Sequence, residues 1–278
     1  MKKSINFIVL IIFLIASTLT AQEKLKGNKE VTTENRDISE FTKIEVIDNV
    51  DVFLIYNENQ SVNVKTDSNL QSAILTEVNN GTLTINTSAK IVREKELSVY
   101  IKVNRDLKEI YAYNNVKVIS ENSLIIDSLR VHAFDNSKFN LKLNSKLVHI
   151  NSKKTSNLNL SILCDEIFIR SEESCDIKAV IDTKYININN LDRAAITMSG
   201  TCDDMEIESM GSSSFKGKDF QSKNATINAM HTSDIYVNAL ENLDIFAKNS
   251  SEVYIYSNPK ITISEFFDKA SLHKKEID

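Results

Sequence analysis

Two neighbouring aspartates, Asp203 and Asp204, are the residues of this 278-residue chain that could most directly carry out chemistry. Two carboxyl groups held close together can act as general acid and general base on a glycosidic bond, and their separation sets the stereochemical outcome. The same pair could instead bind a hard cation through oxygen ligands. Which of the two applies depends on the elements that position the side chains.

Metal and thiol chemistry have little support in the sequence. The four histidines are scattered, at His132, His149, His231 and His273. No CysXXCys or HisXXXHis spacing occurs, and neither the glycine-rich aspartate repeat of calcium-binding coils nor a phosphate-binding glycine loop is present. Cys164, Cys175 and Cys202 are expected to be unpaired thiols that fill space. We therefore predict no metal, no cofactor and no catalytic residue.

A repeat of about 19 to 20 residues organises most of the chain. Small or polar residues, called anchors here, recur at Ala112, Ala133, Ser152, Ser171, Asn190, Ser209, Ala229 and Ala247. The residues two places before and six places after every anchor are apolar. Such a period, with apolar residues two apart, is typical of stacked β-strands that wind into a coil. The sequence predicts an all-β fold, a parallel β-helix of about eight coils with a smaller N-terminal β section.

Polar residues after each anchor are expected to form the corners of the coil. Asn114 and Asn115 follow the first anchor, and Asp135 and Asn136 follow the second. Asparagine tolerates the left-handed backbone conformation, and serine or threonine can satisfy corner amides, so short polar residues suit this place in a chain with only five glycines.

The repeat also places the acidic residues. Asp165, Lys184 and Asp203 fall in one column on successive turns, and an alternation of acid and base is typical of a neutral surface ladder. Polysaccharide-cleaving β-helices would also need a histidine–glycine step, and no histidine here precedes glycine. We therefore predict a protein that is not an enzyme, and keep a carbohydrate-active enzyme or carbohydrate-binding protein of the β-helix type as the alternative.

Aromatic residues are the candidates for binding. Tyr236 and Tyr254 both lie seven places after an anchor, and Tyr111, Tyr113 and Phe246 also fall near outward positions. Exposed rings can stack on sugar faces or anchor a protein partner. The alternative is that stacked rings only strengthen packing between strands.

The two ends of the chain have different expected roles. Residues 1–21 have the charged, apolar and small-residue regions of a signal peptide. Residues 22–40 are expected to form a loose arm, residues 41–105 the N-terminal β section and residues 106–263 the repeats. Residues 264–278 are expected to be a C-terminal cap and tail in which Phe266 and Phe267 close the hydrophobic end. No later stretch approaches the roughly 20 apolar residues of a membrane span.

The net charge of −5 argues against nucleic-acid binding, because no basic surplus is available to replace phosphate counterions. The predicted signal peptide favours a periplasmic or secreted protein, or one at the cell surface. A glycan or a cell-surface protein is the expected partner.

The segment 41–85, which reads FTKIEVIDNVDVFLIYNENQSVNVKTDSNLQSAILTEVNNGTLTI, together with Asp106-Leu107 and the repeats, resembles the putative auto-transporter adhesin, head GIN domain family. The late stretch from Tyr256 to Lys260 is also similar to the usual ending of that family, although Ser257 replaces an expected glycine. The resemblance implies a right-handed parallel β-helix in exported envelope proteins. It implies an adhesin-like or scaffolding module that presents a flat face to its partner.

Overall fold

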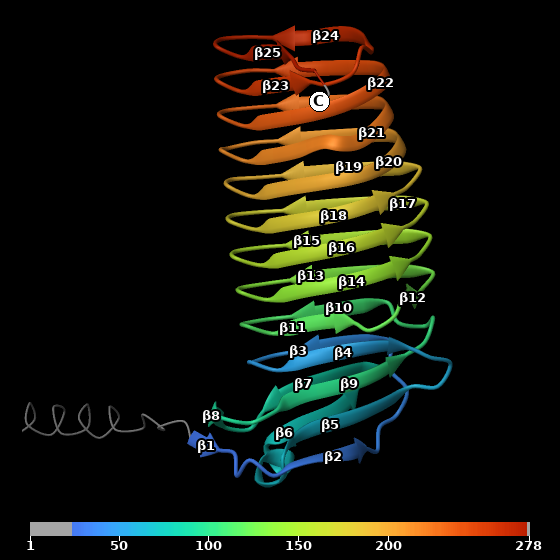
Figure 1. Ribbon diagram of the computed structural model, residues 1–278, viewed down its shortest axis with the longest axis vertical. Coiled ribbons are helices and arrows are strands. Elements are labelled where there is room, and N and C mark those ends of the chain that lie inside the picture. Colours follow the sequence, from blue (N-terminus) through green and yellow to red (C-terminus); the bar gives the residue numbers. More distant parts are fainter. Residues whose placement is uncertain (1–23, 277–278) are drawn as a thin grey trace, which may run out of the picture.

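The computed structural model describes residues 24–276, and the signal peptide expected at residues 1–21 lies outside them. The chain winds into a β-solenoid in which each turn contributes one strand to each of two sheets, and the turns stack along one axis (Figure 1). The all-β parallel coil predicted from the repeat is therefore confirmed. No helix of the described part is long and apolar enough to cross a membrane.

The strands that end at the anchors, together with the strands that continue their ladder at both ends, form the first sheet. They are β7 (Thr82–Thr87), β3 (Lys43–Val46), β10 (Glu109–Ala112), β13 (Ser128–Ala133), β15 (Leu147–Ser152), β17 (Glu166–Ser171), β19 (Tyr185–Asn190), the second halves of β20 (Ala195–Ser209), β21 (Ser214–Ala229) and β22 (Asp234–Ala247), and β24 (Lys260–Phe266). All of these pairs are parallel, and each anchor lies opposite the next.

The strands that follow the corners form the second sheet. They are β9 (Leu97–Val103), β4 (Asp51–Tyr56), β11 (Lys117–Ser120), β14 (Lys138–Asn144), β16 (Asn157–Leu163), β18 (Asp176–Asp182), the first halves of β20, β21 and β22, β23 (Glu252–Ile255) and β25 (Ser271–Lys274). A short strand, β12 (Leu124–Ile125), pairs with the end of β14.

The N-terminal β section continues the same coil, but its turns are stacked out of sequence order. Strand β3 lies between β7 and β10, and β4 lies between β9 and β11 (Figure 1). The turn made by β7 and β9 therefore sits beneath the turn made by β3 and β4, although it comes later in the chain.

Antiparallel strands cover the N-terminal end of the solenoid. β6 (Ile74–Asn79) pairs with β7, β5 (Ser61–Asp67) pairs with β9, and β2 (Val31–Arg36) pairs with β5. The 3-10 helix η1 (Ser68–Ala73), in the segment where a short helix is expected, buries Leu70 over this end. A separate parallel pair joins β1 (Lys24–Lys26) to β8 (Lys90–Arg93).

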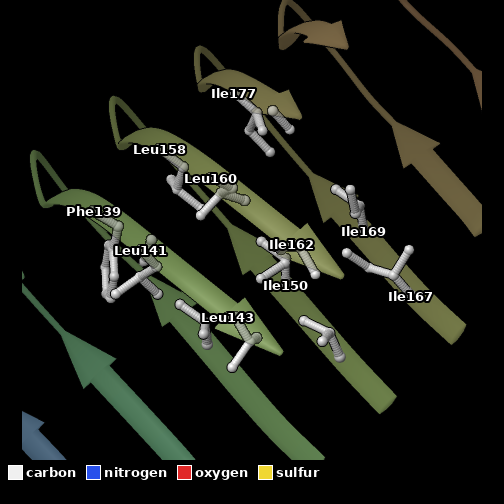
Figure 2. Packing of buried hydrophobic residues seen from close by; sticks show 14 of the residues in the cluster. Phe139, Leu141, Leu143, Ile150, Leu158, Leu160, Ile162, Ile167, Ile169 and Ile177 are labelled. Atoms are coloured by element: carbon white, nitrogen blue, oxygen red, sulfur yellow. The ribbon is translucent and has the colours of Figure 1, made fainter. Parts of the chain in front are cut away.

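The core is the stack of side chains that the repeat predicts. Every one of the apolar residues two places before or six places after an anchor is at most 2% exposed. Figure 2 shows one such column, in which Phe139, Leu158 and Ile177 come from successive turns, with Ile150 and Ile169 on the opposite strands. Each buried aliphatic side chain contributes roughly 1.5–3 kcal/mol, so the interior stabilises the coil.

The corners contain a column of left-handed residues two places after each anchor. It comprises Asp48, Asn114, Asp135, Lys154, Glu173, Asp192, Gly211, His231, Asn249 and Asp268, all with φ between 53° and 81°. Asparagine, aspartate and glycine adopt this conformation readily, as the corner composition predicts. Lysine and glutamate adopt it less readily, yet Lys154 and Glu173 occupy the same column.

Replacing Glu173 with glycine is expected to raise the free energy of unfolding by about 0.5–1 kcal/mol, because it removes the left-handed penalty of a side chain that is exposed. The same change at Glu166, an exposed residue within strand β17, is the control. It is expected to lower stability by about 0.5–1 kcal/mol. Urea unfolding of both variants measures the two effects. A loss of stability in Glu173→Gly would contradict a left-handed penalty at this position.

The C-terminal segment forms another turn of the coil. Strand β24 pairs with β22, and β25 pairs with β23. Phe266 and Phe267 are 40% and 53% exposed, so they do not close the hydrophobic end. Phe266 continues an inward column, but no further turn of the described chain covers it.

Candidate functional site

Tyr236 and Tyr254 form one continuous column of rings on the second sheet. Their centroids are 4.4 Å apart with an interplanar angle of 9°, and His273 of β25 stacks on the other side of Tyr254 at 4.7 Å. The prediction that the two tyrosines lie at the same position of neighbouring turns is confirmed. The C-terminal segment adds a third ring, His273. Because each ring packs on the next, Tyr254 has both of its faces covered.

Lysines surround this tyrosine column. Lys275 Nζ lies 5.1 Å from the centroid of Tyr254, and Lys218 Nζ lies 5.8 Å from that of Tyr256. With Lys274 and Glu276 these side chains line an open groove of about 660 Å³. The groove is therefore an aromatic surface with a surplus of positive charge.

The tyrosine hydroxyls of the column remain protonated. Tyr254 donates a short hydrogen bond to Glu252, and this bond, with burial, raises the pKa of the Tyr254 hydroxyl. Burial and the charge of Asp234 raise the pKa of Tyr236. Both phenols are therefore neutral at physiological pH, and the single O–H of Tyr254 is already donated to Glu252.

Tyr111 and Tyr113 belong to a second and larger group of rings, on the outer side of the first sheet. Tyr111 stacks on His132 at 4.3 Å with an interplanar angle of 3°, and Tyr113 stacks on Phe134 at 5.2 Å. His132 and Phe134 are 6.1 Å apart. The four rings come from β10, β13 and the corners that follow them, which lie on neighbouring turns (Figure 1).

A further row of rings lies on the same side of the first sheet, on the turns above. His149 lies 5.0 Å from Phe168, and Phe168 lies 5.9 Å from Tyr185. We call the half-buried rings of this surface the aromatic face; they are Tyr111, Tyr113, His132, Phe134, His149, Phe168 and Tyr185. The structure thus adds five residues to the two predicted for this surface. The repeat contains their signal, since His149 and Phe168 both lie three places before an anchor.

Phe246 does not join either group. It lies on the outer side of the first sheet near the C-terminal end, and Lys248 Nζ is 5.5 Å from its centroid. The five residues predicted for binding therefore fall in three places: two tyrosines in the tyrosine column, two in the aromatic face and Phe246 alone.

An ion-pair network anchors the lower edge of the aromatic face. The hydroxyl of Tyr111 donates to Glu109 at 2.7 Å, and Glu109 also lies 3.3 Å from Lys43 and 3.4 Å from Arg130. The hydrogen bond from Tyr111 and the two cations lower the pKa of Glu109, while burial and this carboxylate raise the pKa of Tyr111 to about 12. The edge of the face therefore carries a carboxylate held between two cations.

Burial lowers the pKa of both histidines of the aromatic face, and the charge of Arg130 adds to the effect on His149. The folded state thus favours neutral imidazole, whereas the unfolded chain binds protons below pH about 6.5. The contribution of these two histidines to stability is expected to be constant above that pH and to decline as the pH falls below it. Thermal unfolding at pH 7 and pH 5 should show this decline. Replacing His132 and His149 by phenylalanine preserves the rings and should reduce the decline, and an unchanged slope would contradict the assignment.

The predicted acidic column is a ladder of ion pairs. Asp165 lies 2.7 Å from Lys184, and Asp203 lies 2.6 Å from Lys223. Asp204 accepts a hydrogen bond from Asn224 at 2.8 Å. The two carboxylates that are candidates for acid and base chemistry are therefore each bonded to a neighbour.

A groove of about 550 Å³ runs beside this ladder. It lies where the chain passes from the second sheet back to the first. Asp127 there pairs with Lys146 at 3.3 Å, and Asp182 accepts hydrogen bonds from the backbone N–H and the hydroxyl of Thr201. Its apolar part includes the exposed Leu163. Within residues 24–276 no group of three or more histidine, cysteine, aspartate or glutamate side chains could hold a metal ion.

The three cysteines are free and buried, as expected for unpaired thiols. Thr183 lies on the turn between Cys164 and Cys202, and the Cys164 thiol donates to its hydroxyl at 3.4 Å. Burial raises the pKa of both thiols, that of Cys202 to about 12. These sulfurs therefore remain protonated, and they pack as small apolar groups.

Comparisons with known proteins agree with the fold. The model of the family described as putative auto-transporter adhesin, head GIN domain matches residues 40–167 and 161–259. No curated protein sequence matches the chain.

Several crystal structures share the solenoid. A putative lipid binding protein from Parabacteroides distasonis ATCC 8503 is 20% identical, with a TM-score of 0.67 over 91% of this chain and 100% of that one. A putative adhesin from the same strain is 15% identical, with a TM-score of 0.66 over 92% and 100%. A putative adhesin from Parabacteroides merdae ATCC 43184 is 16% identical, with a TM-score of 0.63 over 91% and 99%. At these identities the likeness concerns the fold alone.

Proposed function

Because the chain belongs to the putative auto-transporter adhesin, head GIN domain family, we propose that it is a non-catalytic, exported, adhesin-like module that presents a flat face of its solenoid to a partner. The aromatic face is the surface we assign to this role. It is the largest collection of outward rings on the described chain, and it spans β10 to β19 on one sheet.

The composition of this surface suits a protein partner. Aromatic side chains and arginine are enriched in the energetically important parts of protein interfaces. Arg130 and Arg170, with side chains 52% and 55% exposed, flank the rings. Because the rings are already stacked on one another, little side-chain freedom remains to be lost on binding.

The same stacking makes sugar binding on ring faces less suited to this surface. A sugar ring that stacks on an aromatic side chain needs a free aromatic face. In both groups the interior rings, such as His132 and Tyr254, have neighbours within 6.1 Å on both sides. These interior rings then present only their edges to the solvent.

Binding of the purified chain, begun at residue 22, to immobilised extracellular-matrix proteins, mucins and a glycan panel tests this proposal. Phe134→Lys with Phe168→Lys should lower affinity for the retained protein at least tenfold. Phe53→Lys is the control, since Phe53 stacks on Tyr100 at 4.9 Å on the opposite sheet. Equal losses in both variants would overturn the assignment to the aromatic face.

A carbohydrate-binding protein is the second candidate, and the tyrosine column favours it. The lysines around Tyr236, Tyr254 and Tyr256 would attract an acidic glycan. In the same glycan panel, retention of acidic members that is lost on Tyr236→Ala with Tyr254→Ala would support this function. Shortened glycan products that disappear in Asp203→Asn would instead establish an enzyme.

Export is the remaining part of the proposal. The leader at residues 1–21 is expected to be removed, which would leave Gln22 as the first residue. N-terminal sequencing of the protein from fractionated cells checks this, and recovery of the uncleaved chain in the cytoplasm would contradict it.

A further inference from the structure

The two ends of the solenoid are finished differently. At the N-terminal end, antiparallel strands and η1 cover the last parallel turn, and Leu70 is fully buried there. At the C-terminal end, all seven residues of β24 are exposed. Within residues 24–276 the repeat therefore ends in an uncovered strand at one end only.

The uncovered strand presents side chains that belong to the core. Ile261, Ile263 and Phe266 lie in register with the buried residues Leu243, Ile245 and Ala247 of the turn below. That register points them into the interior, yet they are 43%, 51% and 40% exposed. They form the open top of the hydrophobic column.

An edge of this kind is a template for another strand. Its free backbone N–H and C=O groups can pair with a second chain, and natural solenoids usually close their terminal repeats with a polar outer surface. Strand β24 carries a charge only near its two ends, at Lys260 and Glu265.

We propose that the C-terminal turn docks onto the same turn of a second copy of this chain, with the two β24 strands paired antiparallel about a two-fold axis through Thr262. In this register Ile261 of each copy lies opposite Ile263 of the other, so both inward side chains meet their counterparts on the same face. One patch serves both partners, as a two-fold interface requires.

The charges of β24 suit pairing with a second copy of the same strand. Lys260 is the first residue of the strand and Glu265 the last but one, and both lie at outward positions of the register. Antiparallel pairing brings Lys260 of each copy close to Glu265 of the other, which gives two opposite-charge contacts. Within residues 24–276 neither side chain has an ion-pair partner, so both are available. The bulge after Ile263 limits the ladder to the first part of the strand.

The charge of Lys274, on the second sheet, does not oppose the proposed contact between two copies. Lys274 occupies the inward column above Ile255, where an unpartnered charge would oppose docking. Its ammonium group instead donates to the backbone carbonyls of Tyr256 at 3.2 Å and Lys275 at 3.1 Å. The charge is thus held by its own turn, and the apolar residues of β24 form the centre of the interface.

The oligomeric state of the chain begun at residue 22 tests the proposal. Sedimentation equilibrium should show a monomer–dimer equilibrium in the native protein. Ile263→Lys should raise the dimer dissociation constant at least about tenfold. Val180→Lys is the matched control, since Val180 is 52% exposed on the side of the solenoid, and it should leave dimerisation unchanged. A native protein that stays monomeric at every accessible concentration would overturn the proposal.

Charge reversal tests the antiparallel arrangement. Lys260→Glu and Glu265→Lys should each weaken the dimer, because each places like charges together in both contacts. Combining the two substitutions in one chain restores opposite charges and should restore dimerisation. A double variant weaker than either single variant would overturn this pairing. Melting temperatures of all variants separate these effects from loss of folding.

Discussion

Replacing Leu158 with alanine is expected to lower the free energy of unfolding by about 2–5 kcal/mol. Leu158 is fully buried, and it lies in register between Phe139 and Ile177 of the adjacent turns (Figure 2). Backbone hydrogen bonds fix the spacing of neighbouring strands near 4.8 Å, so the turns cannot close over the cavity that the shorter side chain leaves. The loss should therefore include both the transfer of the side chain and the unfilled cavity.

The same strand supplies the control for this prediction. Leu163 also lies in β16 but is 56% exposed, and Leu163→Ala should change stability by no more than about 0.5 kcal/mol. Urea unfolding of the two variants measures the difference. Similar values for both positions would show that the inward columns do not carry the stability of the solenoid.

The repeating part of the fold could be predicted because aligning one residue of each repeat, the anchor, fixes the partners of the other residues in the repeat. Once Ser152 and Ser171 are aligned as anchors, Ile150 must lie over Ile169 and Leu158 over Ile177, which the structure confirms. A shift of one residue would turn these side chains outward, so the apolar pattern fixes the register.

The order of the first turns could not be predicted in this way. Alternation marks β3, β4, β7 and β9 as strands with one buried face, but it does not say which strand is paired with which. The chain between β4 and β7 leaves the coil to build the cap and then returns beneath its starting point. Pairing between strands far apart in the sequence has no local signal.

The groups of rings were only partly predictable. Tyr236 and Tyr254 share one column of the repeat, and their stacking follows directly from the register. His273 lies 19 residues after Tyr254, so the same rule would have found it had the tail been aligned as a further turn. Because the C-terminal segment was interpreted as a cap, His273 was not placed in the column. The same interpretation made Phe266 close the hydrophobic end, whereas Phe266 lies on the last strand of the sheet and is exposed.

Replacing Gly200 with alanine is expected to lower the free energy of unfolding by about 3 kcal/mol or more, through strain and overlap together. The φ of Gly200 is 114°, which side chains rarely adopt. An alanine Cβ would overlap the carbonyl oxygen of Ile181 and lie 2.9 Å from its carbonyl carbon. Both atoms belong to the backbone of the adjacent turn, which the parallel ladder holds in place.

Gly81 separates the two contributions to this effect. Its φ is 73°, but the nearest atom to an added Cβ is the hydroxyl oxygen of Thr42 at 3.7 Å. Gly81→Ala should therefore cost only the left-handed penalty of about 1–2 kcal/mol. If chemical denaturation found Gly200→Ala no more destabilising than Gly81→Ala, this would contradict the predicted overlap between an alanine side chain at position 200 and the backbone of Ile181. A larger loss at Gly200 would mean that the spacing between turns is fixed even where the coil carries no side chain, because the hydrogen-bonded ladder rather than local packing sets it.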